Sequence, residues 1–375
     1  MTDVFRFIKL LYFLAMRSLH ILLSLLGLGV LVSCKKSGYE TKDGAVYYKD
    51  YRLSEADYAS FQILNDMFAK DRKSVYYRGV TIIGADCASF SALNEHYGKD
   101  NTTAFYCDNY LDFKLFESRR KDRIIPILGA EARTFEVIEL EYAKDRLRCY
   151  FKETGFAVKD VASFKPLDYP FGRDNEMGYF KLKPIPGSHG RFFTVLSAHY
   201  AKDDRHVYYS SEAADGKIHL LKEAVPDSFS VIGMNYATDQ VHAFYRNNLL
   251  PSADPVSFRQ WDQYTIDYAL DSTSIYFQDK RIEQADKATF RLLADDYAQD
   301  HKTAFYKNNP LISSHVTSFT VLQSGYAKDT ERVYFEGKIL TKADATSFAL
   351  VDNDADRDAA DRQYSYKEGK RIKLN

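Results

Sequence analysis

Histidines and clustered carboxylates are the side chains of this sequence that could do chemistry. His189, His199 and His206 form a local group, but their spacing matches no zinc signature. The run from Asp352 to Asp358 alternates carboxylates as a calcium loop does, yet Arg357 stands where the sharp turn requires glycine. We find no nucleophile elbow, phosphate-binding glycine loop or Cys-x-x-Cys pair. The sequence therefore predicts no metal site, no cofactor and no enzyme.

One aspartate recurs with a fixed set of neighbours. It ends the tetrapeptide Tyr-Ala-x-Asp and precedes a small apolar residue with an aromatic pair, a turn, and then Ala-Asp-x-x-Ser/Thr-Phe, a pattern we call the template. The copies are centred on Asp43, Asp71, Asp100, Asp145, Asp203, Asp239, Asp271, Asp300 and Asp329, with a half copy at Asp361. So many equivalent carboxylates favour a structural turn role, because an active site needs a single special constellation.

The spacing of these copies defines the elements that would hold them. Asp271, Asp300 and Asp329 are 29 residues apart, a period typical of stacked supersecondary units. Each repeat is predicted to contain a short β-hairpin, one helical turn capped by aspartate, and another short strand. We therefore expect a mainly β chain that forms an elongated, solenoid-like array. A closed, propeller-like ring is the alternative.

The repeated motif also resembles a known family. Tyr142-Ala143-Lys144-Asp145, Tyr200-Ala201-Lys202-Asp203 and Tyr326-Ala327-Lys328-Asp329 each lead into an aromatic pair and look like the DKNYY family of bacterial envelope proteins. The resemblance covers most of the chain from about Asp43, although Asn seldom follows the aspartate and its neighbour, so the five letters never occur intact. It implies a repeat protein of the envelope and supplies no catalytic residue or ligand.

Residues 1–33 have the composition of a secretory signal peptide. Basic Arg6, Lys9 and Arg17 precede an apolar run that ends in Leu-Val-Ser-Cys at Cys34. Because this ending resembles the bacterial lipobox, we expect lipidation of Cys34 and a short tether over residues 34–41. An uncleaved transmembrane helix is the alternative.

The location follows from this anchor. Lys35 and Lys36 come after the cysteine without an aspartate, which favours the outer over the inner membrane of a bacterial envelope. Translation starts at Met1 or at Met16, since Met16 would begin a compact signal peptide of ordinary shape.

The rest of the chain divides by its template copies. N-terminal repeats are predicted over 42–164, with an insertion at 108–129, and C-terminal repeats over 192–375. Residues 165–191 contain several prolines and glycines and no Tyr-Ala-x-Asp. We interpret that stretch as an insertion or hinge, with a binding loop as the alternative.

Net charge and cysteine content bear on nucleic-acid binding and on disulfide formation. The formal net charge of −1 gives no basic surface for nucleic acid. Cys107 and Cys149 could form one disulfide, but the interpretation we favour is that each is a buried thiol that packs as a small apolar side chain.

The function predicted from these features is binding without catalysis. We expect a lipid-anchored scaffold for another envelope or surface protein, since repeat arrays present long binding surfaces. Glycan binding through exposed Tyr and Phe rings is the alternative. The sequence identifies no ligand-binding residue.

Overall fold

Small antiparallel sheets make up almost all of the structure. The computed structural model describes residues 38–114, 117–211, 216–352 and 354–372, and contacts within the chain define unit 1, residues 1–155, and unit 2, residues 156–375. The described residues form one sheet of three strands and ten of four strands. In each sheet, neighbouring strands are consecutive in the sequence.

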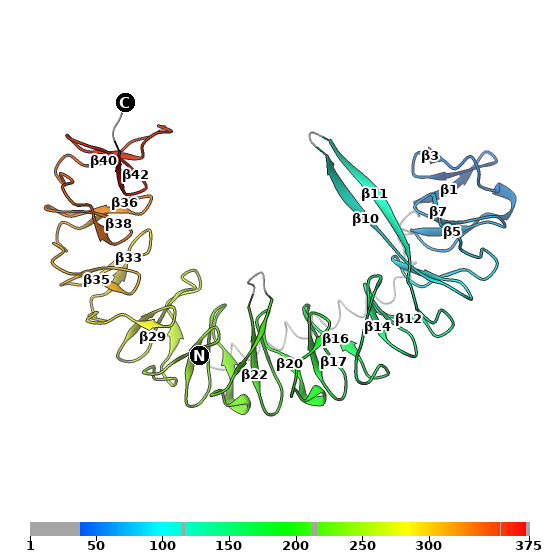
Figure 1. Cartoon of the computed structure of the whole chain (residues 1–375), viewed down its shortest axis with the longest axis horizontal. Helices are drawn as coiled ribbons and strands as arrows, with labels where there is room; N and C mark the ends of the chain where they lie inside the picture. The colour runs from blue at the N-terminus through cyan, green and yellow to red at the C-terminus, as the bar shows by residue number, and fades with distance from the viewer. Residues whose placement is uncertain (1–37, 115–116, 212–215, 353, 373–375) are drawn as a thin grey trace, which may run out of the picture. The chain divides into compact units, whose positions relative to one another are not determined.

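Unit 1 contains the first four sheets in tandem (Figure 1). Its strands are β1 (Tyr39–Lys42), β2 (Ala45–Tyr48), β3 (Tyr51–Arg52), β4 (Gln62–Ile63), β5 (Phe68–Lys70), β6 (Val75–Tyr77), β7 (Val80–Thr81), β8 (Ser91–Ala92), β9 (Tyr97–Lys99), β10 (Ala104–Lys114), β11 (Glu117–Pro126), β12 (Glu136–Glu139), β13 (Tyr142–Lys144), β14 (Cys149–Phe151) and β15 (Thr154–Phe156). One 3₁₀ turn, η1 (Tyr58–Ser60), precedes β4.

Unit 2 continues with seven further sheets of four strands. Its strands are β16 (Lys165–Pro166), β17 (Phe171–Arg173), β18 (Gly178–Phe180), β19 (Lys183–Pro184), β20 (Thr194–Val195), β21 (Tyr200–Lys202), β22 (Val207–Ser210), β23 (Ile218–Leu221), β24 (Ser230–Val231), β25 (Tyr236–Thr238), β26 (Ala243–Tyr245), β27 (Asn248–Leu250), β28 (Arg259–Gln260), β29 (Tyr268–Leu270), β30 (Ile275–Phe277), β31 (Lys280–Arg281), β32 (Arg291–Leu292), β33 (Tyr297–Gln299), β34 (Ala304–Tyr306), β35 (Asn309–Leu311), β36 (Thr320–Gln323), β37 (Tyr326–Lys328), β38 (Val333–Phe335), β39 (Lys338–Ile339), β40 (Ala349–Leu350), β41 (Ala359–Ala360), β42 (Ser365–Lys367) and β43 (Lys370–Ile372). Two 3₁₀ turns, η2 (Gly190–Phe192) and η3 (Pro226–Ser228), lie before β20 and β24.

The predicted mainly β array of hairpin repeats is confirmed. No closed barrel or propeller occurs in the part of the chain that the structure describes, so the ring alternative finds no support there. The predicted helical turn forms a 3₁₀ turn in three of the described repeats and a hydrogen-bonded turn in others. Asp286 caps its turn by accepting the N–H of Ala288 at 2.9 Å, whereas the Asp57 side chain makes no such cap bond.

The core is a row of aromatic rings that joins successive sheets. In unit 2 the template phenylalanine Phe258 lies between Tyr236 of the preceding sheet and Tyr276 of its own sheet, with ring centroids 5.6 and 5.5 Å apart. Such tilted and edge-on pairs add to the stability gained from burying apolar area. The Ser/Thr-Phe element of the template therefore links one repeat to the next.

The alanine of Tyr-Ala-x-Asp is small because this phenylalanine lies over it. Ala69, Ala269 and Ala327 are fully buried. In unit 1 the same position is Gly98, and an added Cβ there would lie 2.3 Å from Cζ of Phe90. The strand backbone and the ring thus approach as closely as a small residue allows.

Residues 165–191 are not an insertion or hinge. They contain the sheet β16–β19 and the turn η2, so this stretch is a regular repeat. Pro166 and Pro184 lie in the two edge strands of that sheet, where a missing N–H costs no ladder bond. The prediction failed because prolines in such short edge strands look like loop residues in the sequence.

The two ends of the repeat series also differ from expectation. Asp43 is exposed and, with φ of 50°, forms with Gly44 the tight turn between β1 and β2, so it is not a template aspartate. The half copy at Asp361 instead belongs to a complete sheet, β40–β43.

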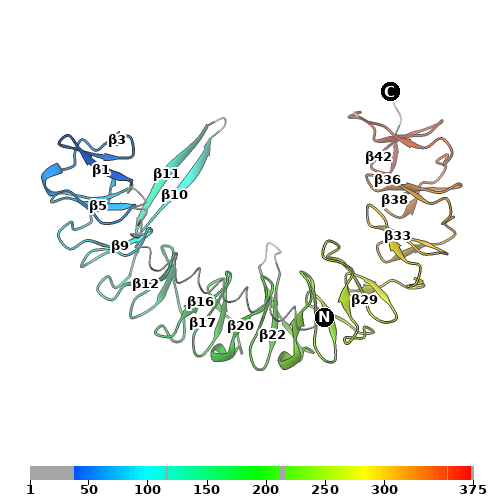
Figure 2. The same ribbon diagram turned by 180° about the vertical axis from the view of Figure 1, so that it is seen from behind.

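The predicted insertion at 108–129 contains most of a long hairpin (Figures 1 and 2). β10 and β11 pair from Phe105–Pro126 to Lys114–Glu117, whereas the neighbouring β9 pairs with β10 only as far as Tyr106. Asp122 of β11 forms an ion pair with Arg78, with 2.8 Å between Arg78 Nε and Asp122 Oδ1. This contact joins the middle of the hairpin, at the pair of Asn109 and Asp122, to the preceding sheet.

Candidate functional site

The template aspartate is a buried acceptor that joins two segments of backbone and, in most repeats, a tyrosine hydroxyl. Oδ1 of Asp271 accepts the N–H groups of Thr273 and Ser274 at 2.8 and 2.7 Å. Its Oδ2 accepts the Asp254 N–H at 3.0 Å and the Tyr276 hydroxyl at 2.7 Å. The predicted Asx-type turn is therefore confirmed. The same carboxylate also binds the turn at Asp254, which precedes the template phenylalanine.

The same backbone bonds recur in both units. Each carboxylate accepts the N–H groups two and three residues ahead and the N–H of the residue 14 or 17 positions before it, and Asp174 also accepts the N–H of Lys159. The aspartates are Asp71, Asp100, Asp145, Asp174, Asp203, Asp239, Asp271, Asp300, Asp329 and Asp361.

Asp174 is a member of this set that sequence reasoning missed. It follows Phe171-Gly172-Arg173, so neither Tyr nor Ala of the template is present. Its carboxylate nevertheless accepts the hydroxyl of Tyr179, five residues on. The usable signal was an aspartate with an aromatic residue at that spacing.

The remaining polar groups of the template are also bonded within the array. The hydroxyl of Ser347 donates to Asp344 Oδ2 at 2.6 Å and accepts the Arg362 N–H at 3.1 Å. The hydroxyl of Tyr297 donates to Gly325 O at 2.9 Å, in the following repeat. Lys328 Nζ donates to Phe348 O at 2.9 Å in the same way.

The motif is thus explained by the fold. Its acid, hydroxyl, phenol and ammonium groups each complete backbone hydrogen bonds that burial would otherwise leave unmade. A functional site must lie at positions where repeats differ from one another.

The pKa values of the bonded pair Asp271 and Tyr276 are shifted in opposite directions. Burial by itself would raise the pKa of the Asp271 carboxyl, but the N–H and hydroxyl groups that it accepts lower that pKa below its usual value. Burial, and then the bond to Asp271, raise the pKa of Tyr276. The pair is therefore carboxylate and phenol at neutral pH.

We expect the array to lose stability in acid. The pKa of the carboxyl is lowered in the folded state at Asp71, Asp145 and Asp271, among others, so its stabilising effect is present above the unfolded pKa of about 3.9. It is lost as pH falls through that value and the lower folded pKa. Melting temperatures followed by circular dichroism from about pH 6 to about pH 2.5 measure this.

The control for this pH effect is Asp71→Asn, which cannot titrate at that position. We expect its melting temperature to depend less steeply on pH below about pH 4 than that of the wild type. Equal slopes in the two proteins would contradict a role for Asp71 in acid sensitivity.

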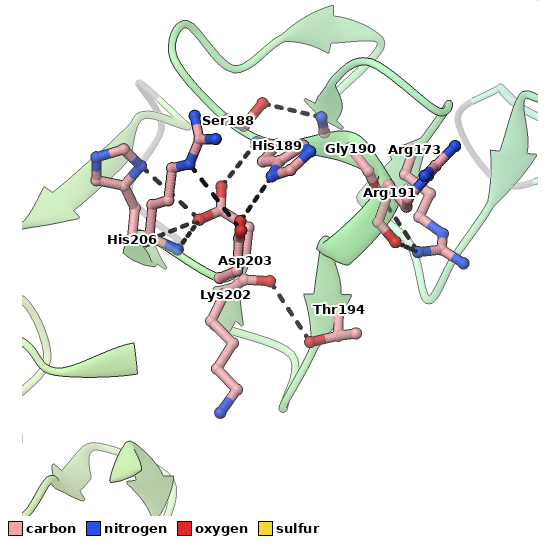
Figure 3. Close-up of polar contacts among 12 residues, drawn as sticks. Arg173, Ser188, His189, Gly190, Arg191, Thr194, Lys202, Asp203 and His206 are labelled. Carbon is pink, nitrogen blue, oxygen red and sulfur yellow. Dashed lines mark hydrogen bonds and ion pairs between the residues drawn. The ribbon is translucent and has the colours of Figure 1, made fainter. Parts of the chain in front are cut away.

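The repeat around His189 departs from the template at two positions (Figure 3). His189 stands where most other repeats have an acid, and its Nδ1 lies 2.8 Å from Asp204 Oδ1. In unit 1 the equivalent contact is Asp57 with Arg72, 2.8 Å apart, so acid and base are exchanged. Phe192 replaces the template Ser/Thr and contacts the His189 ring edge-on at 4.7 Å.

The histidines do not form one site. His189 N–H donates to buried Asp203, and Nδ1 of His206 lies 3.8 Å from the same carboxyl group (Figure 3). His199 instead lies 3.1 Å from Ser210 O through its Nδ1. Among the described residues, no three His, Cys, Asp or Glu side chains are placed to hold a metal ion together.

The other candidates from the sequence are placed as follows. Asp354 accepts Asp356 N–H at 2.9 Å and Arg357 Nε at 2.8 Å, which is a turn between β40 and β41 rather than an open loop of ligands. Cys107 is buried, its pKa is raised by burial, and it forms no disulfide in the described part of the chain. The possible disulfide between Cys107 and Cys149 is therefore absent, and both side chains are buried, as the favoured interpretation expects. Cys34 and the predicted signal peptide lie outside the described residues.

Comparison with known proteins gives one match. A family model described as the DKNYY family matches residues 14–109 and 310–370. No curated protein and no solved structure matches the chain. The residues that the structure describes include no helix long and apolar enough to cross a membrane.

Proposed function

We propose that this chain, in which residues 14–109 and 310–370 match the DKNYY family, is a lipid-anchored repeat protein of the bacterial envelope that binds another envelope or surface protein without catalysis. The observation that supports this is the use of the template's polar side chains in the fold. Asp271 binds backbone of its own turn, Ser347 binds the N–H of Arg362 in the turn at Asp361, and Tyr297 binds the next repeat. A scaffold needs this regularity, and an active site would need one departure from it.

Departures that could bind a partner lie on exposed elements. The hairpin β10–β11 has no further strand paired with it beyond Tyr106, and Tyr110 and Leu111 on it are exposed. The ion pair of Asp122 with Arg78 joins the hairpin to the preceding sheet. A solvent-exposed hairpin that is anchored to a neighbouring sheet can serve as a recognition element in a scaffold protein.

Glycan binding has less support than protein binding. It would need accessible rings, but both rings of the template pair are buried in β6, β26 and β30. Tyr264 and Tyr169 are exposed, but they lie outside the template pairs. A sugar site would therefore depend on such single rings.

In-cell crosslinking of wild type and Cys34→Ser tests the proposal. We expect the wild type in the membrane fraction, crosslinked to a reproducible protein partner, because a diacylated cysteine anchors the chain beside envelope proteins. Cys34→Ser should leave the membrane fraction and lose most of the crosslinked partner. The recovered material is analysed for both peptides and wall sugars.

Each outcome of the crosslinking experiment has a distinct meaning. Wall sugars without a protein partner would favour the glycan alternative. A Cys34→Ser chain that stays in the membrane fraction would contradict the lipid anchor and favour the uncleaved helix. Recovery of neither protein nor sugar would contradict the binding function.

A further inference from the structure

A hollow of about 540 Å³ opens on the surface of unit 2, beside β24 and β28. Ile232, Met234 and Ile266 give it apolar walls, and Arg259 and Gln260 of β28 contribute polar groups. Its volume is in the range of sites that bind small ligands or a few residues of a peptide. Met234 is exposed, so this apolar surface faces solvent.

The hollow lies beside a loop that is longer than in most of the repeats. Asp271 accepts the N–H of Asp254, 17 residues earlier, whereas Asp300 accepts that of Asp286, 14 residues earlier. The extra residues fall between Trp261 and Tyr268, where the next repeat has a shorter turn. We call residues 262–266 the lip.

Both ends of the lip are held by the core. Trp261 packs on the buried cluster of the following sheet, 5.7 Å from the Phe290 ring. Asp267 accepts the Tyr245 hydroxyl at 2.7 Å, and its carbonyl accepts the Tyr236 hydroxyl at 2.7 Å. The hollow is therefore preformed, and binding a ligand does not require the free energy of ordering this loop.

Within the lip a second turn fixes the direction of the chain. Asp262 Oδ1 accepts the N–H groups of Tyr264 and Thr265, both at 2.8 Å, and the Thr265 hydroxyl at 2.9 Å. These bonds commit the Asp262 carboxylate to its own turn. They also present Tyr264, which is 83% exposed, beside the hollow.

Two charged side chains line the hollow, Arg259 and Asp262, and the Asp262 carboxylate is bonded to its own turn, which leaves Arg259 as the charge open to a ligand. Among the described residues Arg259 has no ion-pair or hydrogen-bond partner, in contrast to Arg72 and Arg146, which face acids. Gln260 Oε1 is buried and likewise accepts no hydrogen bond in the described part of the chain. An unpaired guanidinium beside apolar walls suits a carboxylate on an otherwise apolar ligand.

We propose that this hollow binds an extended peptide segment of a protein partner, with an apolar side chain against Ile232, Met234 and Ile266 and a carboxylate on Arg259. Aliphatic walls suit a leucine-like side chain better than a sugar ring, and a peptide supplies the N–H donors that a buried amide oxygen lacks. The inference rests on the scaffold function and adds the chemistry of the partner.

The test uses two fluorescein-labelled peptides that differ in one charge, Gly-Leu-Asp-Leu-Gly-amide and Gly-Leu-Asn-Leu-Gly-amide. Binding to the mature chain is measured by fluorescence anisotropy up to about 1 mM protein. We expect the acidic peptide to bind about tenfold more tightly, because a charge-assisted bond to arginine is worth more than a neutral one.

Substitutions assign the effect to the hollow. Arg259→Gln should reduce binding of the acidic peptide to the level of the amide peptide, and Met234→Asp should abolish binding of both. Arg291→Gln is the matched control, since Arg291 holds the equivalent position in β32 and is exposed but does not line the hollow. It should bind as the wild type does.

Equal affinity of the wild type for the two peptides, or equal loss in Arg259→Gln and Arg291→Gln, would overturn the proposal. So would the absence of binding of either peptide. Those results leave the scaffold function standing if crosslinking in cells still recovers a protein partner. Failure of the scaffold function is shown instead by crosslinking that recovers no partner.

Discussion

Replacing Asp271 by alanine is expected to lower the free energy of unfolding around β28–β31 by about 4 kcal/mol, because several hydrogen-bond donors lose a charged acceptor at once. Its carboxylate accepts the N–H groups of Thr273, Ser274 and Asp254 and the hydroxyl of Tyr276. Asp271 is almost fully buried, at 2% exposure, and water cannot replace it at every donor.

The measurement is urea unfolding followed by the fluorescence of Trp261, the single tryptophan of the chain. Trp261 packs against the same group of sheets, so it reports on this region even if other repeats unfold separately. We expect the midpoint of the Trp261 transition to fall in Asp271→Ala. Unchanged midpoints would contradict the role of the carboxylate.

Asp300 offers a matched comparison. It accepts the same three kinds of N–H group, but Phe305 stands where Asp271 has Tyr276, so no phenol reaches it. Asp300→Ala should therefore cost about 1 kcal/mol less than Asp271→Ala. The converse change, Tyr276→Phe, should cost about 1 kcal/mol by itself.

The sequence predicts the parts of this fold that depend on short-range bonds. The turn at Asp329 uses N–H groups two and three residues ahead, and the strand at Val333–Phe335 follows directly. A pattern of residue types within a few positions contains all that these elements need. The repeat period, the hairpins and the turn role of the aspartate could be predicted for that reason.

Contacts between repeats could not be predicted in the same way. The hydroxyl of Tyr97 donates to Glu141 O and Lys152 O, which lie 44 and 55 residues further on, across the long hairpin. Nothing local in the sequence specifies those partners. Burial of both template rings at Tyr76 and Tyr77 also depends on how closely the next repeat packs.

The hollow at Arg259 was missed for a related reason. Its walls come from two loops of different repeats, and its size depends on extra residues after Trp261. The irregular spacing between Asp254 and Asp271 was visible in the sequence. That spacing shows where a loop is longer, but the packing of neighbouring repeats decides whether the longer loop leaves space.

Phe135→Ala is expected to destabilise unit 1 by about 3–5 kcal/mol, the cost of removing a buried phenylalanine and leaving a cavity. Phe135 is 1% exposed and lies between Tyr97 and Tyr150, with ring centroids 5.6 and 5.3 Å away. Because these tyrosines belong to successive sheets, one substitution removes packing from both.

Hydrogen exchange separates this coupling from a local defect. In Phe135→Ala we expect faster exchange of the amides in both β9 (Tyr97–Lys99) and β13 (Tyr142–Lys144), because opening of one sheet now exposes the other. Leu128→Ala, at a position 87% exposed, is the control in the same unit and should exchange as the wild type does. Faster exchange confined to residues near Phe135 would mean that the ring fills space without joining the repeats. Faster exchange in both strands would mean that the phenylalanine of the template is what makes consecutive repeats one cooperative body.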